Sequence, residues 1–193
     1  GPYQISNTDI ISTMGITGAA DAYATISSSD FVFTSDHVDS WMSVDAEYAA
    51  QSISQVIAAA LDNTNEVFGY RQWKVTTNGT WDGTVSVQVY VGGSWVTISN
   101  MTSSNNSNYN TSGDIPYDYP VKVRLHVVLN GASAPVTLTL NCDKFTFRYN
   151  VKIVSYLNAS TVRGIIPEHG GTSSGAGNPY IESVGTADWA MGS

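Results

Sequence analysis

Apolar residues alternate with polar ones over most of the chain after residue 67, and this period of two constrains the fold more than any other feature. The clearest runs are 84–91, with valine at every second position, and 121–129, where valine and leucine alternate with Lys122, Arg124 and His126. Successive side chains of a β-strand point to opposite faces of a sheet, so the pattern predicts strands with one buried face.

Turn-forming residues separate these runs. Asn78-Gly79, Asp82-Gly83 and Gly92-Gly93 are typical of tight turns between antiparallel strands. The segment 100–114 is rich in asparagine and serine and almost without apolar residues, so we expect a long loop there. Short strands joined in this way predict an all-β fold, an antiparallel β-sandwich of the jelly-roll or carbohydrate-binding-module kind.

Residues 46–62 support two interpretations. Ala46, Ala49 and Ile53 begin an apolar pattern with three- and four-residue spacing, which favours a short helix near 46–61. Ser52 and Ser54 weaken that pattern and leave an extended segment as the alternative. Residues 1–30 are small and polar, and we expect them to form a flexible N-terminal connector.

Charge and cysteine content exclude several classes of protein. The formal net charge is −8, and the 8 lysines and arginines are spread along the chain, so we expect neither nucleic-acid binding nor attachment to anionic lipid. Membrane insertion is not expected either, since no apolar run approaches about 20 residues. The single cysteine, Cys142, excludes an internal disulfide and suits a small buried position.

Signatures of catalysis are missing from the sequence. His37, His126 and His169 have no partner at the spacing of metal ligands, and the aspartates near His37 lack the pattern of a calcium loop. We therefore predict a protein that is not an enzyme and that uses no cofactor or metal.

Aromatic residues offer the best candidates for binding, with 5 tryptophans and 11 tyrosines. An aromatic ring can stack on the C–H groups of a sugar while neighbouring amides bind its hydroxyls. The candidate glycan contacts in and beside the asparagine-rich segment are Tyr109, Tyr117, Tyr119, Asn106, Asn108 and Asn110. The alternative is that these tyrosines cover strand ends and that Trp73 and Trp95 pack in the core or at an edge.

One ordered set of motifs is more specific than its parts. Residues 69–89 join a tryptophan strand, the sequence Thr-Asn-Gly-Thr-Trp-Asp-Gly and an alternating strand, and 92–95 add a Gly-Gly-Ser-Trp hairpin. Together with the flanking segments 33–38, 149–156 and 186–192, this set resembles a sandwich found in virion proteins of tailed bacteriophages. It departs at Asp39, where that family usually has glycine.

The resemblance implies a domain organisation. Residues 31–62 plus 149–193 would form a small discontinuous β-module, and 63–148 would form a sandwich inserted into it. In that family the Trp-Ala-Met-Gly stretch leads into a further region, so we expect this chain to be a fragment of a longer protein.

The resemblance also implies a function. We expect a non-enzymatic structural domain of a phage tail protein, of the nozzle, tube-adaptor or fibre class, located in the virion and serving assembly or surface decoration. Its partners would be other tail proteins, and the full-length protein would be homo-oligomeric. The alternative is a carbohydrate-binding module that helps the virion recognise a host-surface glycan.

Overall fold

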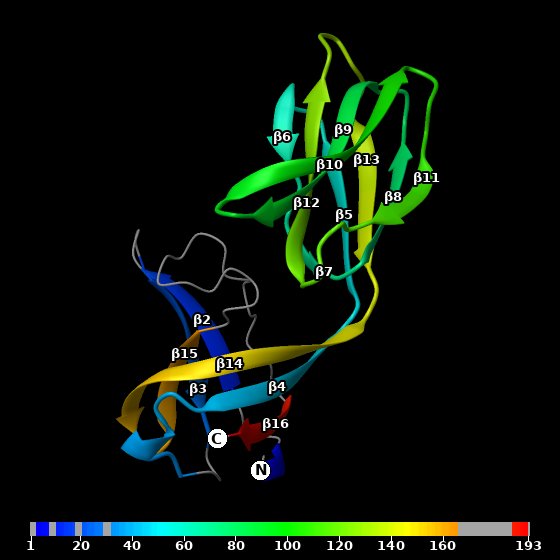
Figure 1. The fold of residues 1–193 in the computed structure, drawn as a ribbon. Helices are drawn as coiled ribbons and strands as arrows, with labels where there is room; N and C mark the ends of the chain where they lie inside the picture. Colours follow the sequence, from blue (N-terminus) through cyan, green and yellow to red (C-terminus); the bar gives the residue numbers. More distant parts are fainter. Residues whose placement is uncertain (1–2, 8–10, 18–20, 29–31, 166–186, 193) are drawn as a thin grey trace. The chain divides into compact units, whose positions relative to one another are not determined.

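The computed structural model describes residues 3–7, 11–17, 21–28, 32–165 and 187–192, and these form antiparallel β-sheets (Figure 1). Within those ranges the only helical element is a 3-10 turn, Ser35–His37. The predicted all-β fold is therefore confirmed. The chain divides into two compact units: unit 1 is Gly1–Tyr48 with Thr146–Ser193, and unit 2 is Ala49–Phe145.

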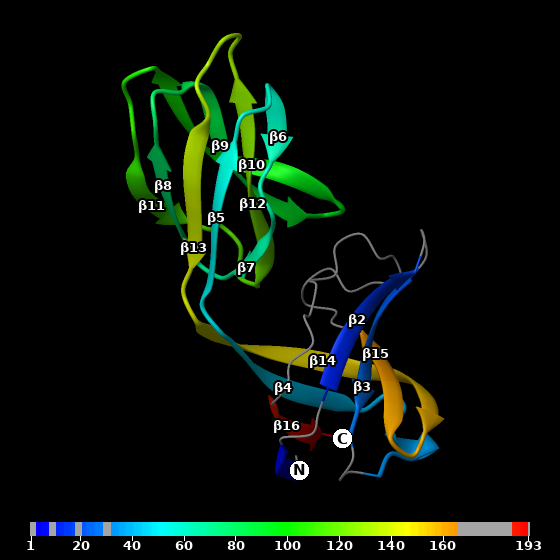
Figure 2. The same cartoon turned by 180° about the vertical axis from the view of Figure 1, so that it is seen from behind.

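Unit 2 is built from two antiparallel sheets, visible from both sides in Figures 1 and 2. The first has the order β10-β9-β12-β6, with β7 also pairing with β12; the strands are β10 Ser94–Ser104, β9 Asp82–Val91, β12 Val121–Leu129, β6 Leu61–Asn63 and β7 Val67–Gly69. The second has the order β11-β8-β13-β5; the strands are β11 Asn110–Asp114, β8 Gln72–Asn78, β13 Val136–Cys142 and β5 Gln51–Ile57.

The core of unit 2 follows the alternation of the sequence. Val85, Val87 and Val89 on β9 are fully buried, and the polar residues between them lie on the opposite face of the sheet. The second sheet contributes further fully buried side chains, among them Val75, Leu140 and Val136. Trp81, in the turn between β8 and β9, is also fully buried, as expected for a tryptophan that packs in the core.

Unit 1 contains a seven-stranded sheet of order β1-β16-β4-β14-β15-β3-β2. Its strands are β1 Tyr3–Asn7, β16 Ala187–Gly192, β4 Trp41–Tyr48, β14 Phe145–Asn158, β15 Thr161–Ile165, β3 Asp21–Ser27 and β2 Ile11–Thr17. Tyr48 and Tyr149 are buried and share a hydroxyl–hydroxyl hydrogen bond of 2.9 Å. Burial is the main reason that the pKa of Tyr149 is raised well above its usual value.

The chain crosses between the units through two short links. Ala49 and Ala50 separate β4 from β5, and Asp143 and Lys144 separate β13 from β14. At the unit 2 end of these links, Gln51 of β5 is paired with Cys142 of β13. In unit 1 the strands β4 and β14 are themselves neighbours. Unit 2 is thus inserted into unit 1 through adjacent strands.

Of the two interpretations of residues 46–61, the short helix is wrong and the extended segment is confirmed. This segment forms the end of β4, then β5 and β6. Ile53 is partly buried and Ile57 is buried, whereas the alternate residues Ser52, Ser54 and Val56 are exposed, which is the period of a strand. Pairing with β13 along the whole of β5 supplies ladder hydrogen bonds on one side of this edge strand and overrides the helical preference of the alanines.

Other boundaries also differ from expectation. The segment 1–30, expected to be a connector, contains the paired strands β1, β2 and β3. Residues 49–62, expected in the discontinuous module, lie in unit 2. Within the segment expected to be a long loop, β10 extends to Ser104 and β11 begins at Asn110. Asp39 has a φ of 73°, so the backbone there keeps a conformation that favours glycine.

Candidate functional site

Asn108 and Tyr109, two of the predicted glycan contacts, are used inside the fold. The Asn108 side chain accepts a hydrogen bond from Trp81 Nε1 at 3.2 Å and donates one to the carbonyl of Gly79 at 3.1 Å. The Tyr109 hydroxyl donates to the carbonyl of Thr102 at 2.6 Å, and its ring packs against the core. These groups hold the β10–β11 connection against the β8–β9 turn.

The other four candidates do not complete a single surface with this pair. Tyr117 and Tyr119 are half-buried against the core, with ring centres 5.8 Å apart and planes inclined by 46°. They follow β11, whereas Tyr109 precedes it, and a strand of this length spans roughly 13 Å. Asn106 and Asn110 have exposed side chains. Burial raises the pKa of the Tyr119 hydroxyl.

A different group of side chains comes together on the outer face of the first sheet of unit 2. Strand register places Trp95 opposite Tyr90 and Thr97 opposite Gln88 between β10 and β9. It also places Arg124 of β12 opposite Gln88. Because the alternate valines of β9 are buried, all of these side chains lie on the outward face, which we call the Trp95 face.

The centre of the Trp95 face is an aromatic and guanidinium cluster. The Arg124 Cζ atom lies 4.2 Å from the centre of the Trp95 ring, and Arg124 Nε donates to Gln88 Oε1 at 3.0 Å. The Tyr90 ring centre lies 5.3 Å from that of Trp95, with planes inclined by 59°. Cation–π attraction of this kind holds an arginine over an indole ring.

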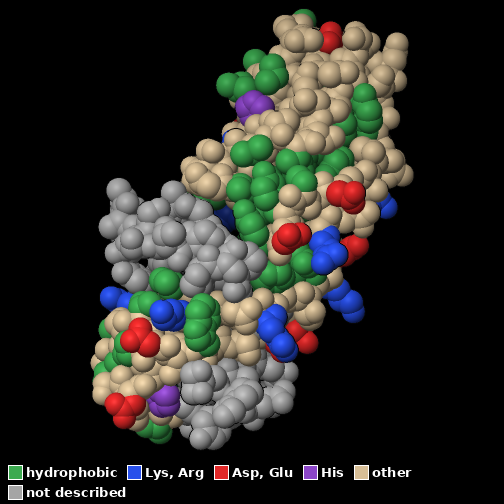
Figure 3. Space-filling model, in the orientation of Figure 1, with side chains coloured by type: hydrophobic (Ala, Val, Ile, Leu, Met, Phe, Trp, Pro, Cys, Tyr) green, Lys and Arg blue, Asp and Glu red, His purple; other side chains and the backbone are tan. Residues whose placement is uncertain are grey.

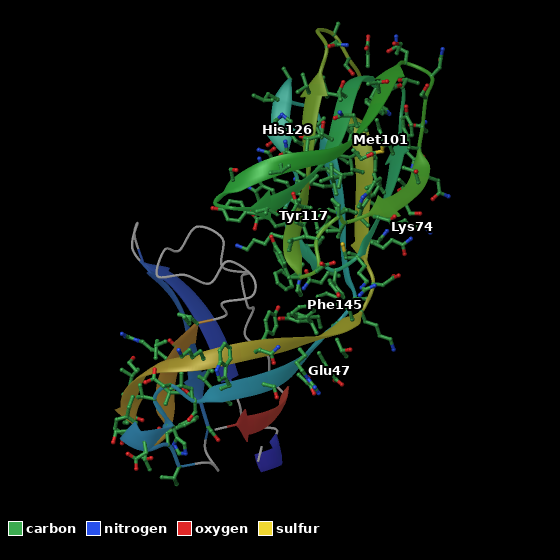
Figure 4. All side chains as sticks on the ribbon, viewed as in Figure 1. Glu47, Lys74, Met101, Tyr117, His126 and Phe145 are labelled. Atoms are coloured by element: carbon green, nitrogen blue, oxygen red, sulfur yellow. The ribbon has the colours of Figure 1, made fainter. Side chains whose placement is uncertain are left out.

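Polar side chains continue the Trp95 face on either side of this centre. Gln88 Nε2 donates to Thr97 Oγ1 at 3.2 Å, and Ser86 Oγ donates to Asn100 Oδ1 at 2.6 Å. His126 Nδ1 and Asn63 Oδ1 are 2.7 Å apart, which joins β12 to β6. Figure 4 labels His126 in this part of unit 2.

The charged side chains at the centre of the Trp95 face, those of Lys122 and Arg124, are both positive. Lys122, Arg124 and His126 project from alternate positions of β12. Lys122 lies 3.6 Å from the Glu66 carboxylate, whereas Arg124 forms no ion pair with any described residue. Figure 3 shows that uncharged side chains dominate the visible side of unit 2. An unpaired guanidinium is therefore the distinctive charge of this face.

The described part of the chain holds one buried thiol and no cluster of potential metal ligands. Within it, no group of three or more histidine, cysteine or acidic side chains is placed to hold a metal ion. Burial raises the pKa of the Cys142 thiol to about 12, which keeps it protonated and unreactive. No helix in the described ranges reaches the length and apolarity that crossing a bilayer requires.

The Trp95 face was not among the candidates from the sequence, although part of its signal is visible there. Tyr90 occupies a polar position of an alternating strand, and a Gly-Gly turn places Trp95 directly opposite it. That arrangement predicts two rings on an outward face. The contribution of Arg124 depends on β12 lying next to β9, which the sequence does not reveal.

Comparison with known proteins identifies no relative. No family model, curated protein or solved structure matches the chain. The resemblance to virion proteins of tailed bacteriophages thus remains a prediction from the motifs.

Proposed function

We propose that this chain is a non-enzymatic structural part of a bacteriophage tail protein, in which unit 1 belongs to the assembled particle and unit 2 is a module carried by it. The observation that supports this best is the insertion of unit 2 between the neighbouring strands β4 and β14. Inserted domains are tolerated where both ends of the insert lie close together, as Gln51 and Cys142 do here.

The edges of the unit 1 sheet suit a role in assembly. The end strands of this sheet are β1 and β2, and each pairs with one neighbour among the described strands. A free strand edge presents backbone groups that can pair with another chain. We propose that other tail proteins, or further copies of this one, bind along unit 1.

Immunogold labelling tests this proposal. Antibodies raised against the purified chain are applied to intact particles of the phage that encodes it, with particles lacking the gene product as the control. Gold confined to the tail is expected. Particles that carry no label, combined with detection of the chain only in infected-cell lysate, would contradict a role in the virion.

The second candidate function is recognition of a host-surface glycan. It is favoured by the Trp95 face, where aromatic rings adjoin amide and hydroxyl groups on an outward surface. The half-buried, dispersed loop tyrosines give it less support. A tail module that binds glycan would combine both functions in one protein.

A further inference from the structure

We propose that the Trp95 face binds an acidic glycan, with Arg124 receiving a sugar carboxylate and Tyr90 stacking on the adjoining sugar ring. This inference rests on glycan recognition, the second candidate function, and names both its site and its ligand class. It does not depend on the proposed place of unit 1 in the particle.

The Arg124 side chain is fixed before any ligand binds, in a position that leaves its terminal amino groups available to a carboxylate. Its Nε–H donates a hydrogen bond to Gln88 Oε1 at 3.0 Å, and its Cζ atom lies 4.2 Å from the centre of the Trp95 ring. Both contacts restrict the side chain while its terminal amino groups have no described partner. Guanidinium groups bind carboxylates through paired, charge-assisted hydrogen bonds, and prior orientation lowers the entropy that binding costs.

Tyr90 supplies a ring for the neighbouring sugar. Its side chain is 38% exposed on the outward face of β9, beside the Gly92-Gly93 turn that leads into β10. The Tyr90 ring and the Arg124 guanidinium lie 5.3 Å and 4.2 Å from the same Trp95 ring, so one short saccharide can reach both. The C–H faces of a pyranose are apolar and pack on such rings.

The remaining side chains favour a polyhydroxylated ligand. Gln88 uses its amide oxygen toward Arg124 and one amide hydrogen toward Thr97, whereas Asn100 and Asn63 each use the amide oxygen within the face. A primary amide has two donor hydrogens and an acceptor oxygen, so each keeps hydrogen-bonding capacity for sugar hydroxyls. They extend from β10 across β9 and β12 to β6, which gives a track longer than one sugar.

An acidic peptide fits this face less well. Strands β9 and β12 each pair on both sides, so their backbone groups are not free to add a peptide strand. Recognition at the centre of the face must therefore come from side chains. Apart from Lys122 and His126, which contact Glu66 and Asn63, those side chains are amides, hydroxyls, rings and the unpaired guanidinium of Arg124, which match a sugar acid.

The experiment is isothermal titration of the whole chain with oligogalacturonate, sialyl-oligosaccharide and oligoalginate, each beside its methyl-esterified or carboxyl-reduced form. We expect at least one acid form to bind and its neutral form to bind about tenfold more weakly, because a charge-assisted hydrogen-bond pair is lost. An acidic peptide of matched length is titrated in parallel and is expected not to bind.

Variants locate the site. Arg124→Gln and Tyr90→Ala are each expected to weaken binding about tenfold or more, and Arg124→Lys should restore little because a lysine lacks the paired donors. The matched control is Lys74→Gln, which removes one exposed positive charge on β8 of the other sheet; its affinity should stay within about twofold of the unmodified chain. Thermal unfolding of every variant verifies that it is folded.

Several results would overturn the inference. The first is that no acid form binds, and the second is that the neutral forms or the acidic peptide bind as tightly as the acid form. The third is that Lys74→Gln weakens binding as much as Arg124→Gln does. The fourth is that binding weakens only when Tyr109, Tyr117 and Tyr119 are replaced. If the Arg124→Gln variant does not fold, the affinity of the Tyr90→Ala variant for the acid form tests the inference in its place. Absence of glycan binding would leave the tail proposal standing, because gold labelling of particles tests that separately.

Discussion

Replacing Asn108 by alanine should destabilise unit 2 although the side chain is exposed. The Asn108 amide oxygen accepts from Trp81 Nε1 at 3.2 Å and Thr77 Oγ1 at 3.4 Å, and its nitrogen donates to the Gly79 carbonyl at 3.1 Å. Trp81 is fully buried, so alanine leaves its indole N–H without an acceptor. Leaving a buried donor unsatisfied costs about 1–3 kcal/mol.

Urea unfolding followed by tryptophan fluorescence measures this loss. The matched control is Asn106→Ala, because Asn106 is exposed and forms no described hydrogen bond; such surface changes stay within about 0.5 kcal/mol. In a thermal scan, 1 kcal/mol corresponds to about 4–8 °C for a unit of this size. Equal stability of the two variants would refute a structural role for Asn108.

Three other predictions concern backbone, thiol and charge. Gly83→Ala should cost at least about 2 kcal/mol in urea unfolding, because φ is 156° and a Cβ would lie 2.1 Å from the Val128 carbonyl oxygen; wild-type stability would contradict this. Cys142 should resist a thiol reagent at pH 8 until urea unfolds unit 2, since burial raises its pKa to about 12; rapid labelling of the folded chain would refute it. The hydrogen bond from Arg148 lowers the pKa of Asp45, so this pair stabilises unit 1 above the unfolded carboxyl pKa and loses that effect as pH falls through the folded value. Arg148→Ala should raise the Asp45 pKa in an NMR titration, and no change would exclude the pairing.

The sheets of unit 2 could be predicted because burial there follows a simple rule. Val85, Val87 and Val89 are buried at every second position, and the turns at Gly79 and Gly92 have positive φ, as glycine allows. Residues 46–61 could not be predicted by the same rule. Ala49 and Ala50 are exposed link residues, so their spacing carries no information about a buried helix face.

The binding residues were harder to predict because their roles depend on contacts distant in sequence. The Asn108 side chain is hydrogen-bonded to Trp81 and Thr77, which lie 27 and 31 positions away in the sequence. Its amide oxygen, which the sequence alone suggests is available for a ligand, is therefore already used within the fold. Arg124 contacts Gln88 and Trp95 only because β9 lies between β10 and β12. Sequence alternation identifies the outward face but does not identify which side chains meet there.

We infer that unit 2 is a self-contained sandwich carried by unit 1. Its core cluster consists of residues between Ile57 and Cys142, with Ile53 packed against it, all inside the unit. The most direct measurement is a ¹H–¹⁵N correlation spectrum of residues 49–145 produced alone. We predict dispersed amide signals and a single cooperative unfolding transition. Collapsed, undispersed signals from a soluble preparation of that segment would show that unit 2 does not fold by itself.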